Sequence, residues 1–384
     1  MPPDPDEDTA PAARVVGSAA RPWPVDGCAC VACAAGGTPR ARTALRIGDL
    51  LLQAGAATTA GTTQRLRAGD RLEAGGVRVV ALPGATAVPA VVAARQEPSP
   101  LTLLWAEGPG DLPGETVDAL TGAQLDAVAL DLRAADARPE PRRLAHTLAR
   151  LRAVDAVAPG ADVVALGLTH DLHPGVLAGR LARWGARVAA DGSALPASGA
   201  AAPGPARRTL VLGPASSGKS DLAEDLLAAE PAVTYLATGP RPEPGDPAWA
   251  ERVDRHRRRR PAWWSTEEST DLAGALRADG PPLLVDALGT WVAAAMDGAG
   301  AWDDAPGWRT EVEDAVDEVV GAWRATRRRV VAVGEEVGWG VGPAERWVAA
   351  FREVLGGLAR RLGDESEQVL LVVAGRAVEL GTAP

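Results

Sequence analysis

The chain has 384 residues, more than a single hydrophobic core usually organises, so we expect two domains. Hydrophobic residues make up 46% and charged residues 23% of it, a composition typical of folded globular proteins and not of disordered ones. The net charge of −10 argues against nucleic acid as a partner, because proteins that bind nucleic acid present basic faces to its phosphates.

The chain begins with an acidic, proline-rich segment, residues 1–13, which has the features of neither a signal peptide nor a transit peptide. We expect this segment to be a disordered tail. No apolar run in the chain approaches the roughly 18 residues that a membrane span requires. We therefore expect a cytoplasmic protein without a membrane span.

All three cysteines of the chain, Cys28, Cys30 and Cys33, lie within six residues of one another. An odd, clustered set of cysteines cannot form a disulfide framework. Thiolates at this spacing suit tetrahedral Zn²⁺, but three ligands do not complete the site, and His170 or His173 would have to supply the fourth. The sequence thus indicates a possible structural zinc site in this half.

Residues 14–191 contain more strand-like runs than helical patterns, which predicts an α+β or sandwich-like architecture. The expected strands are 43–53, 77–84, 101–108, 125–132 and 161–168, and the expected helices are 142–154 and 175–184.

Two segments of this half, GCACVAC (27–33) and THDLHPG (169–175), resemble parts of metallo-β-lactamase-like hydrolases. The H-x-H-x-D-H cluster that holds the metal pair of those enzymes is absent, and His146, His170 and His173 are the only histidines before residue 192. We interpret residues 14–191 as a degenerate metallo-β-lactamase-like domain without catalysis. A domain without zinc is preferred here, and a structural zinc is the main alternative.

Residues 192–207, GSALPASGAAAPGPAR, consist of small residues and prolines without periodicity. Such a composition is typical of a linker. We therefore place the boundary between two domains in this segment.

Residues 208–384 alternate between short apolar runs and longer helical patterns, which predicts a parallel sheet covered by helices on both faces. Expected strands are 209–213, 233–239, 283–288, 330–336 and 368–375, and expected helices are 219–229, 310–326 and 344–362. This half is therefore an α/β domain of three layers.

The sequence GPASSGKS follows the first of these strands and precedes the first helix, which is the context that a P-loop requires. Glycines let backbone N–H groups turn toward a phosphate, and the helix N-terminus adds its positive dipole end. The lysine of the motif, Lys219, is the only lysine in the chain and would stabilise the transferred phosphoryl group. The predicted phosphate cradle is Gly213, Pro214, Ala215, Ser216, Ser217, Gly218, Lys219 and Ser220.

A P-loop needs an acidic partner at the end of a neighbouring strand to hold a metal ion. Asp286 closes the run LLVD, so we expect Ser220 and Asp286 to bind Mg²⁺ together with the nucleotide. A carboxylate that caps the next helix is the alternative interpretation of Asp286. Glu335 and Glu336 close another strand, and either could line the same edge.

Residues 252–261, RVDRHRRRRP, hold the densest group of cations in the chain, and His256 lies inside it. A solvated charge run and a nucleic-acid patch are the plain interpretations. Neighbouring cations favour the neutral form of an imidazole, which is the nucleophilic form, and arginines beside it could hold the phosphates that it attacks. His256 is therefore a candidate covalent nucleophile, with Arg257 and Arg260 as candidate phosphate ligands.

Together these residues resemble the bifunctional adenosylcobinamide kinases/adenosylcobinamide-phosphate guanylyltransferases of cobalamin biosynthesis. The resemblance rests on GPASSGKSDLAE, VTYLATG, RVDRHRRRRPAWWSTEE, LLVDALGTWV, EEVGWGVGP and VLLVVAG, which occur in family order over about 209–380. This chain has Glu335 where the family usually has asparagine, and Arg255 where some members have a histidine.

The resemblance implies a RecA-like P-loop fold and two reactions. A purine nucleotide, ATP or GTP, phosphorylates adenosylcobinamide, and GMP then passes from GTP through a guanylyl-histidine to adenosylcobinamide phosphate. The resemblance also implies that His256 is the nucleophile and that Glu268, Asp286 and the backbone of Ala237, Thr238 and Gly239 contact the guanine nucleotide. We further expect a homo-oligomer. A non-catalytic or regulatory nucleotide-binding module is the alternative function.

Overall fold

The computed structural model describes most of the chain between residues 13 and 381. The residues inside this range that it leaves out are 21–27, 29, 31–32, 34–38, 97–99, 134–139, 171–173, 198–204, 240–250, 252–253, 255–256, 259 and 340–344. The chain divides into two compact units, Met1–Pro205 and Ala206–Pro384. In the part of the chain that is described, no helix is both long enough and apolar enough to cross a membrane.

The first unit contains two sheets. Six strands form an antiparallel sheet, in the order β13 (Ala194–Leu195), β1 (Ala13–Gly17), β2 (Ala44–Ile47), β3 (Leu50–Gln53), β4 (Ala56–Thr59) and β5 (Thr62–Arg65). Seven strands form a mixed sheet, in the order β12 (Ala186–Val188), β11 (Val157–Leu166), β10 (Leu125–Asp131), β9 (Leu101–Ala106), β8 (Ala90–Arg95), β7 (Val77–Leu82) and β6 (Arg71–Ala74).

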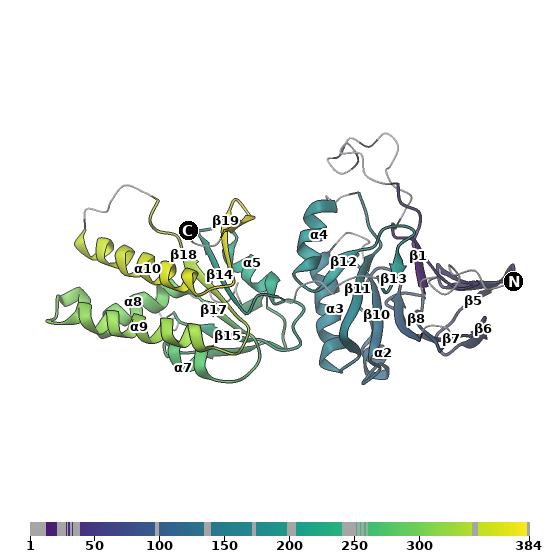
Figure 1. The fold of residues 1–384 in the computed structure, drawn as a ribbon, viewed down its shortest axis with the longest axis horizontal. Helices are drawn as coiled ribbons and strands as arrows, with labels where there is room; N and C mark the ends of the chain where they lie inside the picture. Colours follow the sequence, from purple (N-terminus) through teal and green to yellow (C-terminus); the bar gives the residue numbers. More distant parts are fainter. Residues whose placement is uncertain are drawn as a thin grey trace, which may run out of the picture. The chain divides into compact units, whose positions relative to one another are not determined.

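The two sheets of this unit pack face to face around one core. Alternate residues of their strands point inward, as in β1 and β7, where buried and more exposed positions alternate. Val15, Leu45, Val79 and Leu103 lie in this core. The outer face of the mixed sheet carries α2 (Gly114–Ala119), α3 (Pro141–Ala153) and α4 (Pro174–Ala182) (Figure 1).

The strands and helices expected in residues 14–191 are present, with one strand divided in two. The run at 43–53 forms β2 and β3, because Gly48 takes the positive φ of 54° that a tight turn between them needs. The expected linker is wrong at its start: β13 pairs with β1, and the side chain of Leu195 is fully buried. The expected tail, residues 1–13, is wrong at its end, because Ala13 is the first residue of β1. Residues 1–12 lie outside the described structure.

The second unit contains a seven-stranded sheet, parallel except for its last strand. Its order is β16 (Ser265–Glu268), β15 (Thr234–Ala237), β17 (Leu283–Asp286), β18 (Val330–Glu335), β14 (Arg208–Gly213), β19 (Gln368–Val373) and β20 (Arg376–Leu380). Only β20 is antiparallel to its neighbour. The expected mostly parallel sheet with flanking helices is confirmed.

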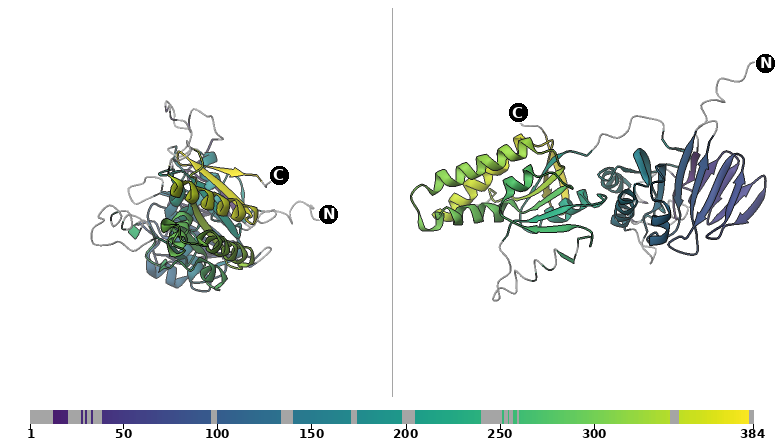
Figure 2. Two further views of the ribbon diagram at one scale, coloured as in Figure 1. Left: turned by 90° about the vertical axis from the view of Figure 1, so that its left-hand side faces the viewer. Right: turned by 90° about the horizontal axis from the view of Figure 1, so that it is seen from below.

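Helices cover both faces of this sheet. One face packs against α7 (Leu272–Arg277), α8 (Leu288–Gly298), α9 (Trp308–Ala325) and α10 (Arg346–Asp364), with η2 (Ala301–Asp303) between α8 and α9. The other face packs against α5 (Lys219–Leu226). Adjacent strand residues serve opposite faces, so Leu210 contacts the first set and Val211 the second. The three longest of these helices, α8, α9 and α10, lie together on one side of the sheet (Figure 2).

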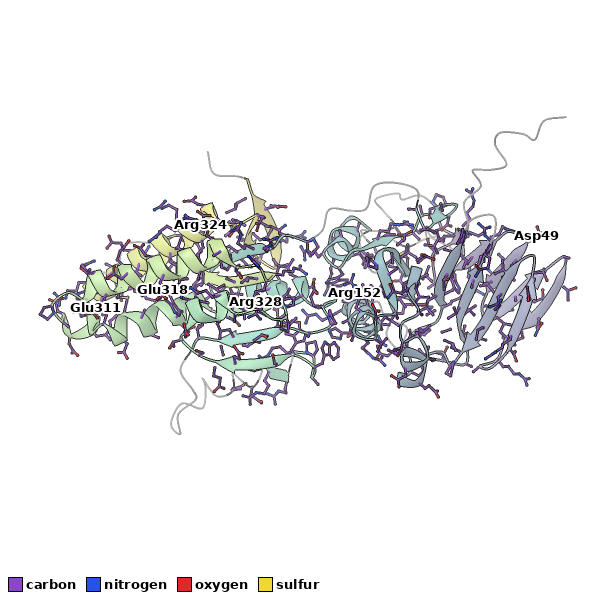
Figure 3. The ribbon with its side chains drawn as sticks, turned by 60° about the horizontal axis from the view of Figure 1, so that its bottom comes forward. Asp49, Arg152, Glu311, Glu318, Arg324 and Arg328 are labelled. Carbon is purple, nitrogen blue, oxygen red and sulfur yellow. The ribbon has the colours of Figure 1, made fainter. Side chains whose placement is uncertain are left out.

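Helix α9 shows why the sequence pattern predicts these helices. Val312, Val316 and Trp323 recur at helical spacing and are buried, whereas Glu311, Glu318 and Arg324 are exposed and charged (Figure 3). Arg277 of α7 donates to Glu318 over 2.7 Å, and Arg324 donates to Glu365 over 2.6 Å. The apolar stripe therefore holds the helix against the sheet, and its exposed charges pair with neighbouring helices.

Candidate functional site

The residues expected to bind nucleotide gather at the carboxyl edge of the sheet in the second unit. The strand register places Ala237 beside Glu268 on one side and beside Asp286 on the other. It also pairs Gly213 with Glu335. Strand β18 lies between the P-loop strand β14 and β17, which ends in Asp286. Open α/β sheets bind ligands at this edge, so the fold assembles one candidate site from sequence segments far apart.

The P-loop has the geometry of a phosphate cradle. Gly218 precedes α5 with a φ of +94°, and Ser216 also has a positive φ, of 58°. A side chain at Gly213 would approach the backbone oxygen of Val372 to 2.7 Å, so only glycine fits at the end of β14. Lys219 is 7% exposed, and its Nζ lies 3.4 Å from the carbonyl oxygen of Pro214. The lysine thus folds over the loop that it would serve.

Ser220 and Asp286 meet as the sequence predicts. The Ser220 hydroxyl donates to Asp286 Oδ1 over 3.4 Å, which is a long hydrogen bond. Both groups offer hard oxygen ligands, the type that Mg²⁺ prefers. The residues present therefore fit a magnesium ion bound together with a nucleotide.

Tyr235 is a site residue that the sequence analysis missed. Its hydroxyl donates to the second carboxylate oxygen, Asp286 Oδ2, over 2.7 Å. Burial, followed by the nearby charge of Asp286, raises the pKa of Tyr235, so the phenol stays protonated and remains a donor. Tyr235 is the only tyrosine in the chain and stands two residues before Ala237, the one signal that could have indicated it.

Arg260 stacks on the ring of Tyr235. Its guanidinium carbon lies 3.7 Å from the ring centroid, within the range of a cation–π contact. Burial lowers the pKa of Arg260, although an arginine remains charged at neutral pH. Its Nη1 also donates to the hydroxyl of Thr266 over 3.1 Å. The structure thus brings one cation of the arginine-rich segment to the candidate site.

Other expected site residues are partly engaged by the protein itself. The Thr238 hydroxyl donates to the carbonyl of Ala287 over 2.6 Å. Glu335 accepts from the backbone N–H of Gly289 over 3.0 Å, and Glu336 accepts from that of Gly338 over 2.8 Å. Both glutamates lie at the edge as expected, with hydrogen bonds that hold the loops around it.

The remaining expected residues differ in how much the structure says of them. Glu268 is exposed at the end of the edge strand β16, and Gly239 is half-buried just after β15. Arg257 is helical and exposed. His256 and Arg255 lie outside the described residues, so the role of His256 stays a prediction.

Replacing Tyr235 with phenylalanine tests whether it positions Asp286. A hydrogen bond to a charged group is worth about 1.5–3 kcal/mol, so we expect kinase kcat to fall by at most about 10- to 100-fold. Tm should fall by several degrees because this hydrogen bond is lost, and the fold should stay intact because phenylalanine fills the same space. Steady-state kinetics and a thermal melt measure both quantities, and an unchanged kcat would show that Tyr235 has no positioning role.

The first unit brings the three cysteines together with His170, which lies about 140 residues after them in the chain. His170 Nδ1 is 3.3 Å from Cys28 Sγ and 3.5 Å from Cys30 Sγ. One ligand atom from each of Cys28, Cys30, Cys33 and His170 lies within 4.8 Å of all the others. The backbone N–H of Cys33 and the His170 ring lower the pKa of Cys30 to about 6. Among the described residues this is the one group of three or more His, Cys, Asp or Glu side chains that could hold a metal ion.

A second polar cluster in the first unit is centred on Asp131, whose carboxylate is bound by other groups of the protein. The Asp131 side chain is 1% exposed and pairs with Arg133. It also accepts from the backbone N–H of Gly108 over 3.1 Å. A side chain at Gly167 would come within 2.2 Å of Asp131 Oδ1, so the carboxylate is packed closely on this side as well.

Comparison with known proteins gives consistent matches to the second unit. Residues 209–380 match the family model described as cobinamide kinase / cobinamide phosphate guanyltransferase. The chain is 32% identical over 180 residues to the bifunctional adenosylcobalamin biosynthesis protein CobU of Salmonella typhimurium, covering 44% of this chain and 98% of that protein. It is 35% identical over 185 residues to the bifunctional adenosylcobalamin biosynthesis protein CobP of Pseudomonas aeruginosa, covering 46% of this chain and 99% of that protein. The CobU protein of Escherichia coli is 32% identical over 180 residues.

Proposed function

The chain belongs to the cobinamide kinase / cobinamide phosphate guanyltransferase family, and we propose that both reactions take place at the carboxyl edge of the sheet in its second unit. It is an enzyme of cobalamin biosynthesis with kinase and guanylyltransferase activities. The observation that carries the proposal is the convergence of the P-loop, Asp286 and Tyr235 at that edge.

In the kinase step, the hydroxyl of adenosylcobinamide attacks the γ-phosphorus of ATP or GTP, and the nucleoside diphosphate leaves. The backbone of Gly213–Ser220 holds the β- and γ-phosphates, and Lys219 stabilises the charge that develops on the transferred group. Ser220 and Asp286 would hold Mg²⁺, which neutralises phosphate charge when it is bound. Tyr235 keeps the carboxylate of Asp286 in place.

In the guanylyl step, a nitrogen of His256 attacks the α-phosphorus of GTP, and pyrophosphate leaves. The phosphate of adenosylcobinamide phosphate then attacks the guanylyl-histidine, which forms adenosylcobinamide-GDP and frees the histidine. Arg257 and Arg260 would hold phosphates during this transfer. Glu268 and the backbone of residues 237–239 would contact the guanine nucleotide, since Ala237 lies between Glu268 and Asp286 at the same edge.

ATP and GTP labelled in the γ-phosphate test the kinase step and identify its phosphate donor. We expect the purified protein to transfer the γ-phosphate of ATP or GTP to adenosylcobinamide, giving labelled adenosylcobinamide phosphate. Separate incubations with each nucleotide, with adenosylcobinamide omitted as the control, show which donor is used. Absence of labelled product with both nucleotides would contradict the proposal.

We propose that the first unit is a metallo-β-lactamase-like domain without hydrolase activity. Its two face-to-face sheets with helices on an outer face support this fold. The buried carboxylate of Asp131 is paired with Arg133, which supports the absence of hydrolase activity. Two metal ions per chain together with phosphodiesterase or lactonase activity would overturn it. Assembly into a homo-oligomer stays a prediction, which sedimentation analysis checks.

A further inference from the structure

We propose that Cys28, Cys30, Cys33 and His170 form a structural zinc site, which we call the Cys3His site, in the first unit. The two parts of this site come from opposite ends of the unit's sequence, a loop after β1 and a loop after β11. The proposal is independent of the reactions in the second unit, because none of these residues lies in that unit.

Two sulfur–nitrogen separations in the cluster match those of a tetrahedral zinc centre. Zn–S bonds of about 2.3 Å and Zn–N bonds of about 2.0 Å at tetrahedral angles place sulfur and nitrogen roughly 3.5 Å apart and two sulfurs roughly 3.8 Å apart. The two measured sulfur–nitrogen distances are 3.3 and 3.5 Å. All four atoms lie within 4.8 Å of one another, which leaves room for one small ion between them.

The chemistry of the ligands favours zinc. Three thiolates and an imidazole are soft to intermediate donors, the set that binds Zn²⁺ and not Mg²⁺ or Ca²⁺. The backbone N–H of Cys33 also donates to Cys30 Sγ over 3.4 Å, the kind of hydrogen bond that orients a metal ligand. Four protein ligands fill a tetrahedral shell and leave no position for water or substrate, so the site is structural and not catalytic.

The position of the site explains what the zinc would stabilise. Strand β1 belongs to the antiparallel sheet and β11 to the mixed sheet. Beyond the ends of these strands the two segments already meet, since Ala19 and Leu168 form a bridge and the N–H of Ala20 donates to the carbonyl of Leu168 over 2.9 Å. Zinc on the Cys3His site would fasten the two sheets together at this point.

Elemental analysis of the full-length protein, grown with zinc and purified without chelator, tests the site. We expect about one zinc per chain. Cys30→Ser and His170→Ala should each lose most of this zinc, whereas His146→Ala, which removes a histidine of α3 outside the cluster, should keep it. Kinase activity should be unchanged in all three variants, because the second unit is untouched.

Two measurements on the unmodified protein keep the test independent of variants that fail to fold. Replacing zinc by Co²⁺ should produce the thiolate-to-cobalt charge-transfer absorption of a tetrahedral thiolate site, and removing metal with a chelator should lower the Tm of the first unit. A protein without zinc and without the cobalt absorption would overturn the proposal. So would intact zinc in both Cys30→Ser and His170→Ala, or a disulfide between two of the cysteines found by mass spectrometry.

Discussion

Lys219→Ala is expected to lower kinase turnover about 10²–10³-fold while the fold stays intact. The ammonium is the only one in the chain, and it lies in the P-loop with its Nζ near the Pro214 carbonyl. Stabilising charge that develops in a transition state is typically worth about 3–4 kcal/mol at such a site. No other lysine can replace it, so the loss should appear mainly in kcat.

A matched control separates the local role of Lys219 from a general effect of charge. Arg309→Ala removes an exposed cation of α9, which packs on the face of the sheet opposite α5, and should leave kinase turnover unchanged. Initial rates with adenosylcobinamide and saturating nucleotide, together with a thermal melt, measure the effect. If Lys219→Ala keeps full kinase activity, the assignment of Gly213–Ser220 as the phosphate cradle is wrong.

His256→Ala is expected to abolish transfer of guanine label from GTP to the protein, because it removes the proposed covalent acceptor. Phosphorylation of adenosylcobinamide should persist at least in part. Phosphoryl transfer to a hydroxyl depends on positioning and charge stabilisation and does not need this nucleophile. The two activities should therefore separate in one variant, which is measured with guanine-labelled and γ-phosphate-labelled GTP in parallel.

Arg255→Ala is the matched control for the histidine, since it removes the neighbouring residue without removing a nucleophile. It should retain covalent labelling, with a weaker hold on the nucleotide at most. Label that still attaches in His256→Ala would place the acceptor at another residue and would contradict the assignment of His256 as the nucleophile.

The sequence was sufficient for the features that are local. The P-loop could be predicted because eight consecutive residues between a strand and a helix define it, and α9 because its apolar stripe repeats within one helix. Several strands of the first unit were missed, and in the second unit β16 and β20 were missed. The residues of β16 are exposed and polar, Ser265–Glu268, and β20 is an exposed edge strand, so neither has the apolar run of a buried strand.

Features that join distant segments required the structure. Tyr235 reaches Asp286 only because β15 and β17 are neighbours in the sheet, an order that their positions in the sequence do not fix. The cysteines presented the same difficulty. Their spacing indicated a possible zinc site, although a domain without zinc was preferred, and His170 and His173 were equal candidates for the fourth ligand. The packing of the two sheets brings His170 to the thiols.

The most direct test of the account is a pulse and chase with guanine-labelled GTP on the full-length protein. We expect label to remain on the protein after unbound nucleotide is removed, and to move into adenosylcobinamide-GDP when adenosylcobinamide phosphate is added. Label that binds reversibly and never reaches the corrinoid would contradict the account, and would identify the second unit as a nucleotide-binding module without transferase activity.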